Sequence, residues 1–293
     1  MTEPLFSSVE DVRDRLSATG YLADTAIATT VFLADRLGKP LLVEGPAGVG
    51  KTELAKAVAE ITEARLVRLQ CYEGLDEARA LYEWNYKKQL LRIQASRDDK
   101  PWDEVHDDIF SAEFLLDRPL LTAIRRTEPT VLLVDETDKA DVEVEALLLE
   151  VLSDYQVTVP ELGTVAAARH PFVVLTSNAT RELSEALKRR CLYLHMGYPD
   201  AAREQAIVLA RVPGAAESLA AQVVRTVRAL RAMELRKAPS IAETIDWTRT
   251  VLALGTGGLD AATVRDTLGV VLKHVSDQER AAGSLGLAGG ERG

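Results

Sequence analysis

The strongest constraint on the fold is a glycine-rich octapeptide between a short apolar run and an amphipathic segment. Residues 45–52 read G-P-A-G-V-G-K-T and fill every position of the pattern G-x-x-x-x-G-K-[ST]. Residues 41–43 before it are typical of a buried strand, and residues 52–62 after it carry Leu54 and Val58 at helical spacing. A strand, a glycine-rich loop and a helix in this order predict a loop whose backbone N–H groups wrap a phosphate.

This octapeptide defines the predicted nucleotide contacts, and a glycine-rich turn that matches by chance is the alternative. The residues expected to bind the nucleotide are Gly45, Pro46, Ala47, Gly48, Val49, Gly50, Lys51 and Thr52. Lys51 is expected to reach the β- and γ-phosphates, and the Thr52 hydroxyl is expected to bind Mg²⁺. The flanking strand and helix favour the phosphate loop over the chance match, so ATP with Mg²⁺ is the predicted ligand.

Composition narrows the class of protein further. The 293 residues include 35 Lys and Arg against 45 Asp and Glu, a formal charge of −10, which argues against broad non-specific binding to nucleic acid. Two cysteines, Cys71 and Cys191, and four scattered histidines have no metal-ligand spacing. A secretion signal and an apolar run of about 20 residues are both absent, so a cytoplasmic protein without a membrane span is expected.

Strand-like and helical stretches alternate over the first two thirds of the chain. The expected strands are residues 41–43, 66–69, 131–134, 172–175 and 192–194, and residues 7–37 look helical with a break near Gly20. This alternation predicts an α/β fold with a mostly parallel sheet covered on both faces, which binds ligands at the carboxyl ends of its strands. Three parts are expected: an α/β nucleotide-binding domain over 1–199, helices over 200–280, and a disordered glycine- and alanine-rich tail over 281–293.

Two of the expected strands end in polar residues with chemical potential. Residues 131–136 read V-L-L-V-D-E, so Asp135 is expected in the Mg²⁺ shell and Glu136 as the general base that activates water. A strand that runs into a solvated loop is the alternative for this pair. Asn178 follows the strand at 172–175 and is expected to hold the water or sense the γ-phosphate, with a plain turn residue as its alternative.

Adjacent arginines end the next helical stretch. Lys188, Arg189 and Arg190 form a cationic run at a helix C-terminus, where complementation of the helix dipole is the ordinary explanation. In a phosphate-loop protein, an arginine at this place can instead stabilise charge on the γ-phosphate bound by a neighbouring copy. Arg190 is the first candidate for this catalytic role, and Arg189 is the second.

The order of these parts resembles the AAA+ ATPases over residues 20–275. Four looser strings are similar to the MoxR branch, and to its members associated with maturation of carbon-monoxide dehydrogenase, a molybdenum hydroxylase. They are C-Y-E-G-L-D at 71–76, L-Y-E-W-N at 81–85, R-P-L-L at 118–121 and L-K-R-R-C-L-Y at 187–193. The resemblance implies a P-loop NTPase parallel sheet of order 5-1-4-3-2, a C-terminal α-helical lid, and a ring, taken to be a hexamer, with Arg190 reaching the neighbouring ATP.

The resemblance also implies partners and an adenine site. A von Willebrand factor A-domain protein is the usual partner, and the usual task is to remodel or mature a protein client, such as a molybdenum hydroxylase. The adenine is expected near Tyr21 and Leu22. One departure concerns the lid, because Ala242 stands where related proteins place an arginine, so Arg236 or Lys237 replaces it or the lid couples differently.

Two further segments are candidates for client contact. The aromatic residues Tyr72, Tyr82, Trp84 and Tyr86 either face a client or pack a small core, and residues 157–165 predict a hairpin. Trp102 and Trp247 are interpreted as core or subunit-contact residues. The rival functions are a small-molecule kinase, a nucleic-acid-dependent AAA+ protein such as a restriction translocase subunit or helicase loader, and a nucleotide switch with little turnover.

Overall fold

The computed structural model describes residues 4–95 and 102–285, and the chain forms two compact units. The first unit comprises Met1–Thr19, Ala23–Glu44 and Thr52–His195, and the second comprises Gly20–Leu22, Gly45–Lys51 and Met196–Gly293. Each unit is described by itself. The domain division at residues 199 and 200 that the sequence predicts stays a prediction.

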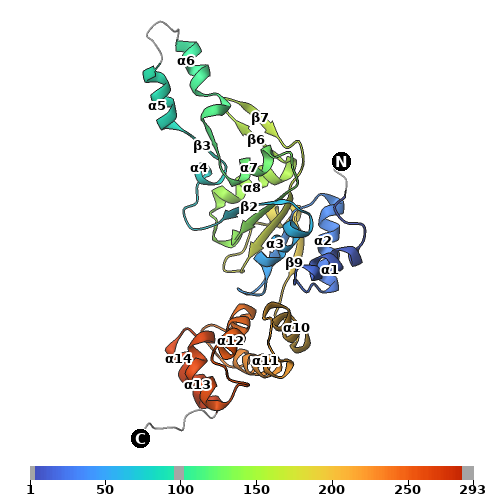
Figure 1. The fold of residues 1–293 in the computed structure, drawn as a ribbon. Coiled ribbons are helices and arrows are strands. Elements are labelled where there is room, and N and C mark those ends of the chain that lie inside the picture. Colours follow the sequence, from blue (N-terminus) through green and yellow to red (C-terminus); the bar gives the residue numbers. More distant parts are fainter. Residues whose placement is uncertain (1–3, 96–101, 286–293) are drawn as a thin grey trace. The chain divides into compact units, whose positions relative to one another are not determined.

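A five-stranded parallel sheet forms the centre of the first unit (Figure 1). Its strands are β1 (Leu41–Glu44), β2 (Arg65–Gln70), β5 (Thr130–Asp135), β8 (Phe172–Ser177) and β9 (Leu192–His195). They lie in the order β2-β5-β8-β1-β9, and every neighbouring pair is parallel. Numbered among themselves along the chain, these strands follow the order 5-1-4-3-2, so the predicted fold class and strand order are confirmed.

Two interior strands, β5 and β8, show that the sheet is covered on both faces. All six residues of β5 and all six residues of β8 are buried, although successive side chains of a strand point to opposite faces. Helix α2 (Thr25–Leu37) packs against β1 and β9, and α7 (Pro119–Arg125) packs against β2 and β5. Apolar runs with no polar face therefore become the interior strands of the sheet.

Other elements of the first unit surround this sheet. They are α1 (Val9–Ala18), α3 (Lys51–Ile61), α4 (Glu77–Ala80), β3 (Tyr82–Trp84), α5 (Tyr86–Ala95), α6 (Trp102–Ile109), η1 (Ala112–Phe114), β4 (Leu115–Asp117), η2 (Thr137–Lys139), α8 (Val142–Asp154) and α9 (Glu185–Arg190). Helix α3 follows the phosphate loop as predicted, with Leu54 and Val58 buried. Ser8 caps α1 by accepting the N–H of Asp11.

Both segments with candidate client contacts have a defined structure. Strands β6 (Gln156–Val159) and β7 (Gly163–Ala166) pair antiparallel, so the predicted hairpin is confirmed. Trp84 is buried and packs edge-on against Phe110, with the ring centroids 5.1 Å apart, as expected if it packs a small core. Tyr72 and Tyr86 are exposed. The side chain of Trp102 lies outside the described residues, and contact with a client stays a prediction.

Five helices form most of the second unit. They are α10 (Ala201–Arg211), α11 (Glu217–Arg231), α12 (Ile241–Ala253), α13 (Ala261–Val271) and α14 (Val275–Ser284), so the predicted C-terminal helical region is confirmed. Trp247 lies in their core with no exposed surface, and its Nε1–H donates to Thr267 Oγ1 at 2.7 Å. This is the core interpretation made from the sequence.

The C-terminal end corrects one prediction. Helix α14 includes Ala281 to Ser284, where the glycine- and alanine-rich composition predicts disorder. Ala281 is fully buried in the helical core, and this packing orders a sequence whose composition favours flexibility. Residues 286–293 lie outside the described chain. Within the ranges that the structure describes, no helix combines the length and the apolar character needed to cross a bilayer.

Candidate functional site

Residues 45–50 of the octapeptide form a loop between β1 and α3, and Lys51 and Thr52 begin α3. Lys51 is buried, and its ammonium group donates to the backbone carbonyls of Gly45 and Pro46 at 2.7 and 2.8 Å. These bonds hold the cation inside the curve of the loop. Lys51 is therefore positioned where the loop would enclose a phosphate.

Two glycines of the loop have no room for a side chain. A Cβ on Gly45 would lie 2.0 Å from the carbonyl oxygen of Met196, and a Cβ on Gly48 would lie 2.4 Å from Ser240 Oγ. Gly48 also has a φ of +73°, which L side chains rarely adopt. Close backbone approach and left-handed geometry thus account for the glycines that the motif requires.

The residues predicted to contact adenine lie beside this loop. The Tyr21 hydroxyl donates to the carbonyl of Gly50 at 3.4 Å, and the Leu22 carbonyl accepts from Arg203 Nη2 at 2.9 Å. The first contact brings the segment containing Tyr21 to the phosphate loop, although Tyr21 and Gly50 are 29 residues apart in sequence. A role in binding adenine stays a prediction.

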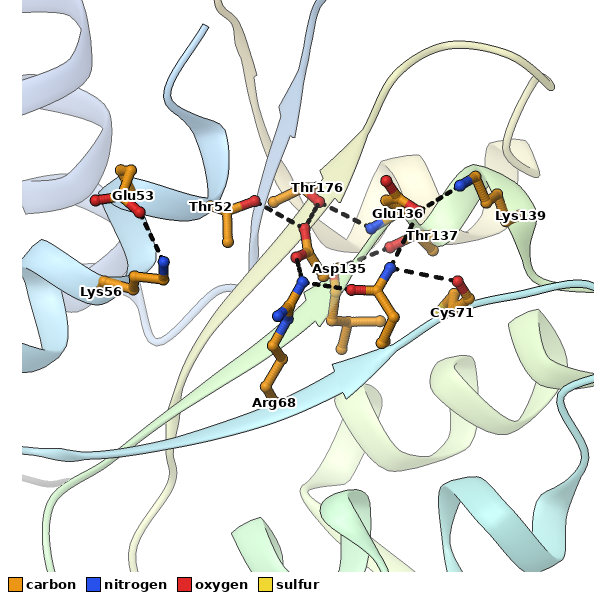
Figure 2. A network of polar contacts seen from close by, with 12 residues as sticks. Thr52, Glu53, Lys56, Arg68, Cys71, Asp135, Glu136, Thr137, Lys139 and Thr176 are labelled. Carbon is orange, nitrogen blue, oxygen red and sulfur yellow. Dashed lines mark hydrogen bonds and ion pairs between the residues drawn. The ribbon is translucent and has the colours of Figure 1, made fainter. Parts of the chain in front are cut away.

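The acid Asp135 ends β5 with its carboxylate buried. Its Oδ1 accepts from Thr52 Oγ1 at 3.0 Å and from Thr176 Oγ1 at 2.6 Å, and its Oδ2 accepts from Arg68 Nη2 at 2.5 Å (Figure 2). Thr52 is the residue directly after Lys51, and Thr176 belongs to the neighbouring strand β8. The predicted pair of Mg²⁺-shell residues, Thr52 and Asp135, is therefore in direct contact.

These residues fit a magnesium ion. Mg²⁺ prefers hard oxygen donors and is commonly held by one or two protein groups together with phosphate oxygens and waters. The adjacent Thr52 hydroxyl and Asp135 carboxylate are donors of this type. Within the described residues no cluster of three or more His, Cys, Asp or Glu forms a separate metal site.

Glu136 presents the second carboxylate directly after β5. Its φ of +57° turns the chain, and its N–H donates to Thr176 Oγ1 at 2.9 Å. Its Oε2 accepts from Gln70 Nε2 at 3.0 Å. The same oxygen accepts from Lys139 Nζ at 2.5 Å (Figure 2). The ion pair with Glu136 raises the pKa of Lys139 from its ordinary value. Glu136 is thus held beside Asp135 while remaining partly exposed.

Asn178 follows β8, the strand next to β5, so it lies at the same edge of the sheet as Glu136. The loop that starts here is fixed by Asp138, whose Oδ2 accepts from the N–H and the hydroxyl of Thr180 at 3.0 and 2.5 Å. Burial by itself raises the pKa of Asp138, but hydrogen bonds from Thr180 and from the backbone of Asn178 outweigh it, so this pKa is lowered. The catalytic role of Asn178 stays a prediction.

The arginine pair ends helix α9. Arg190 Nε donates to Ser153 Oγ at 2.6 Å, and its Nη1 donates to the Ala186 carbonyl at 3.3 Å. Arg189 is exposed and makes no side-chain hydrogen bond or ion pair within the part of the chain that the structure describes. Both arginines lie on the surface, and their action on a neighbouring copy stays a prediction.

The lid position that lacks an arginine lies in the first turn of α12. Ala242 is exposed there, directly after the buried residues Ser240 and Ile241. The backbone N–H groups of Arg236 and Lys237 donate to the Asp277 carboxylate at 3.0 and 3.3 Å. Replacement of the missing arginine by Arg236 or Lys237 stays a prediction.

Four contacts of the acid pair were missed from the sequence. Arg68, Gln70, Lys139 and Thr176 all touch Asp135 or Glu136. A signal for two of them exists, because Arg68 and Gln70 lie two residues apart in strand β2 and so share one face. Their meaning depends on the register of β2 against β5, which the sequence alone leaves open.

The chain is similar in sequence and in fold to known proteins. The chain is 29% identical over 171 residues to proteins of Staphylococcus aureus, from strains bovine RF122 / ET3-1 and USA300, which are described only as uncharacterized. That match covers 56% of this chain and 57% of theirs. Two variants of Thermotoga maritima RuvB share the fold, with TM-scores of 0.52 and 0.51 at 15% and 16% identity. Those alignments cover 96% and 97% of this chain and 85% of each RuvB chain.

A protein family covers the same region. Residues 40–191, just over half of the chain, match the AAA domain of the dynein-related subfamily. This region contains β1, the phosphate loop, the acid pair, Asn178 and the arginine pair. The chain therefore belongs to the AAA domain family, dynein-related subfamily, and contains an ATPase domain whose ligand is ATP with Mg²⁺.

Proposed function

We propose that the protein hydrolyses ATP and uses the energy to remodel another protein, as an AAA+ machine of MoxR type. The observation that carries this proposal is the contact between Thr52 and Asp135 at 3.0 Å, with Glu136 next in the chain. It joins the first helical turn after the phosphate loop to the acids at the carboxyl end of β5. A general base beside the Mg²⁺ shell is what water attack on the γ-phosphate needs.

The residues of the site take distinct roles in this proposal. Thr52 and Asp135 would hold Mg²⁺, which when bound would supply positive charge to neutralise the phosphates. Lys51 would neutralise the β- and γ-phosphates, and Glu136 would accept the proton of the attacking water. Asn178 would orient that water. Arg190 of a neighbouring copy, or Arg189 in its place, would stabilise the charge that develops on the γ-phosphate.

The client and the assembly are also part of the proposal. Sequence strings such as residues 71–76 and 187–193 resemble the MoxR branch and support a ring, taken as a hexamer, with a von Willebrand factor A-domain partner. The same strings favour maturation of a molybdenum hydroxylase such as carbon-monoxide dehydrogenase. The match to the Staphylococcus aureus relatives spans little more than half of their length, so the activity of the complete protein rests on experiment.

Release of phosphate from ATP tests the enzymatic part. The purified protein should release phosphate in the presence of Mg²⁺ without any acceptor molecule, which separates it from a small-molecule kinase. Glu136→Gln should still bind ATP, while its turnover falls by about 100-fold or more because the general base is lost. Lys51→Ala should lose ATP binding, and Glu60→Gln, an exposed substitution on α3, should match the unmodified protein. Full turnover by Glu136→Gln would contradict the proposal.

Capture of a client tests the biological part. The ATP-bound Glu136→Gln variant should retain a von Willebrand factor A-domain protein and a molybdenum hydroxylase from an extract of the native cells more strongly than Lys51→Ala does. If DNA instead stimulates hydrolysis, with a steep dependence on salt, the nucleic-acid-dependent alternative replaces the MoxR assignment. Capture of a client and stimulation of hydrolysis by DNA are separate measurements on the same purified protein, so the two functions can be told apart.

A further inference from the structure

Asp135 already has a cationic partner within its own chain. Its side chain is only 4% exposed, and the Arg68 guanidinium lies 2.5 Å from its Oδ2 (Figure 2). The other carboxylate oxygen, Oδ1, accepts from the hydroxyls of Thr52 and Thr176. A buried carboxylate is costly unless a cation or several donors compensate it, and Arg68 supplies the cation.

Arg68 reaches this carboxylate from an edge strand. Strand β2 is the outermost strand beside β5, and the register pairs Arg68 with Leu133 and Gln70 with Asp135. The Arg68 side chain is 49% exposed, whereas that of Asp135 is 4% exposed. The pair therefore joins a half-exposed charge to a buried one.

Arg68 also contacts the group that holds Glu136. Its Nη2 donates to Gln70 Oε1, and Gln70 Nε2 donates in turn to Glu136 Oε2 at 3.0 Å. A continuous chain of hydrogen bonds thus runs from Asp135 through Arg68 and Gln70 to Glu136. Both acids are connected to one guanidinium.

We propose that Arg68 is the resident counter-ion of Asp135 and competes with the divalent cation for that carboxylate. The inference rests on the proposed function, in which Thr52 and Asp135 hold Mg²⁺. Arg68 and a dication beside the same carboxylate repel each other, so Arg68 must yield the carboxylate or share it. Arg68 would then weaken the cation affinity of the site and keep Asp135 in place when no cation is bound.

The same movement would reach Glu136. When Arg68 leaves Asp135, Gln70 Oε1 loses its donor, and the hold of Gln70 on Glu136 Oε2 becomes weaker. Arg68 is thus a positioning residue that links occupancy of the metal shell to the freedom of the general base.

Cation affinity, measured without turnover, tests the competition. Mn²⁺ binding is titrated by electron paramagnetic resonance with a saturating non-hydrolysable ATP analogue. Arg68→Met should bind Mn²⁺ roughly tenfold more tightly than the unmodified protein, because the competing charge is gone. Arg68→Lys keeps the charge and should stay close to the unmodified value. Arg65→Met removes an exposed cation of the same strand that makes no ion pair among the described residues, so it is the matched control.

Equal or weaker Mn²⁺ binding by Arg68→Met would overturn the proposal. If Arg68→Met does not fold, Arg68→Gln removes the charge while keeping a hydrogen-bond donor, and the same tighter binding is expected. Failure of this test is distinguishable from failure of the proposed function, because the titration needs no hydrolysis and phosphate release is measured separately.

The link to Glu136 has its own test. Gln70→Leu should change the turnover number at saturating Mg²⁺ and leave Mn²⁺ affinity within about twofold, because the Gln70 side chain makes no hydrogen bond to the Asp135 carboxylate. Arg68→Met combined with Gln70→Leu should have the turnover number of Gln70→Leu alone, because both act through one chain of contacts. Additive effects on turnover would contradict the link.

Discussion

Among single residues, Thr176 contacts both acids of the site. Its hydroxyl donates to Asp135 Oδ1 at 2.6 Å and accepts the N–H of Glu136 at 2.9 Å. One buried hydroxyl therefore fixes the side chain of the first acid and the backbone of the second. Because both partners lose a hydrogen bond if it is removed, the consequence should appear in stability and in activity.

We expect Thr176→Val to lower the free energy of unfolding by about 1–3 kcal/mol, because valine keeps the shape but leaves buried polar groups unsatisfied. ATP turnover should fall as well, since Glu136 loses an anchor. Thr176→Ser should restore both properties. Urea unfolding and phosphate release measure them, with the exposed Thr164→Val as control. A Thr176→Val variant as stable and active as the control would refute this role.

Single residues also show how far the sequence could predict the site. The phosphate loop is one contiguous stretch of sequence, and Asp135-Glu136 is another. Each directly follows an apolar run, so the local pattern alone predicted that both lie at the carboxyl ends of strands. Arg68 and Gln70 act on these acids from another strand, and their contacts depend on strand register and on side-chain reach across an edge. No local pattern contains that information.

Among the secondary-structure elements, the connection between β8 and α9 depends on Glu145 of α8. This buried carboxylate accepts the N–H of Ser184 at 3.0 Å and forms an ion pair with Arg181. Burial alone raises the pKa of Glu145, but the hydrogen bonds from Ser184 and the contact with Arg181 reverse this, so the pKa lies below its ordinary value of 4.5. The segment that begins with Asn178 and leads to the arginine pair is held in this way.

This lowered pKa predicts a pH dependence of stability. The folded state holds Glu145 ionised more readily than the unfolded state does, so its contribution is complete above about pH 5 and is lost as the pH falls through the folded-state pKa. Glu145→Gln should cost about 2 kcal/mol of unfolding free energy near neutral pH. The difference from the unmodified protein should shrink in acid.

Urea unfolding across this pH range measures the effect. Glu150→Gln, an exposed substitution on the same helix, is the control and should stay within about 0.5 kcal/mol at every pH. A constant difference between Glu145→Gln and the unmodified protein from neutral to acidic pH would be inconsistent with the lowered pKa.

The helical unit has a buried ion pair of its own. Arg231 of α11 binds both carboxylate oxygens of Glu204 of α10 at 2.7 and 2.8 Å, and these side chains are 9% and 0% exposed. Arg231 also donates to the Pro239 carbonyl, and its guanidinium lies over the Tyr198 ring at 4.3 Å. Two helices and the approach to α12 are thereby tied to one guanidinium.

Arg231→Met should destabilise the protein by about 3–5 kcal/mol, because a buried carboxylate is left without its cation. Arg249→Met is the matched control, since its partner Asp246 is exposed and such pairs contribute at most about 1 kcal/mol. Thermal and urea unfolding followed by circular dichroism measure both variants. Equal stability of the two variants would show that this pair contributes little.

For the whole molecule, the proposed chemistry takes Arg190, or Arg189 in its place, from a second copy of the chain. Within the described chain, the cations that touch the acid pair are Arg68 and Lys139, and both bind carboxylates rather than point to a phosphate. Arg189 and Arg190 lie on the surface at the end of α9, where a neighbouring copy can use them. The sheet order was predictable because the family resemblance is carried by motifs. The ordered end of α14 was not, because packing against the helical core decides it.

Mixing two inactive variants tests most directly whether neighbouring copies build the ATP site together. Glu136→Gln lacks the base and keeps the arginines, whereas a variant with Arg189→Ala and Arg190→Ala keeps the base. Each should release phosphate slowly by itself. The mixture should release it well above the sum of the two, because some interfaces then combine an intact base with an intact arginine pair. A mixture no faster than that sum, in assembled protein that binds ATP, would contradict a shared site.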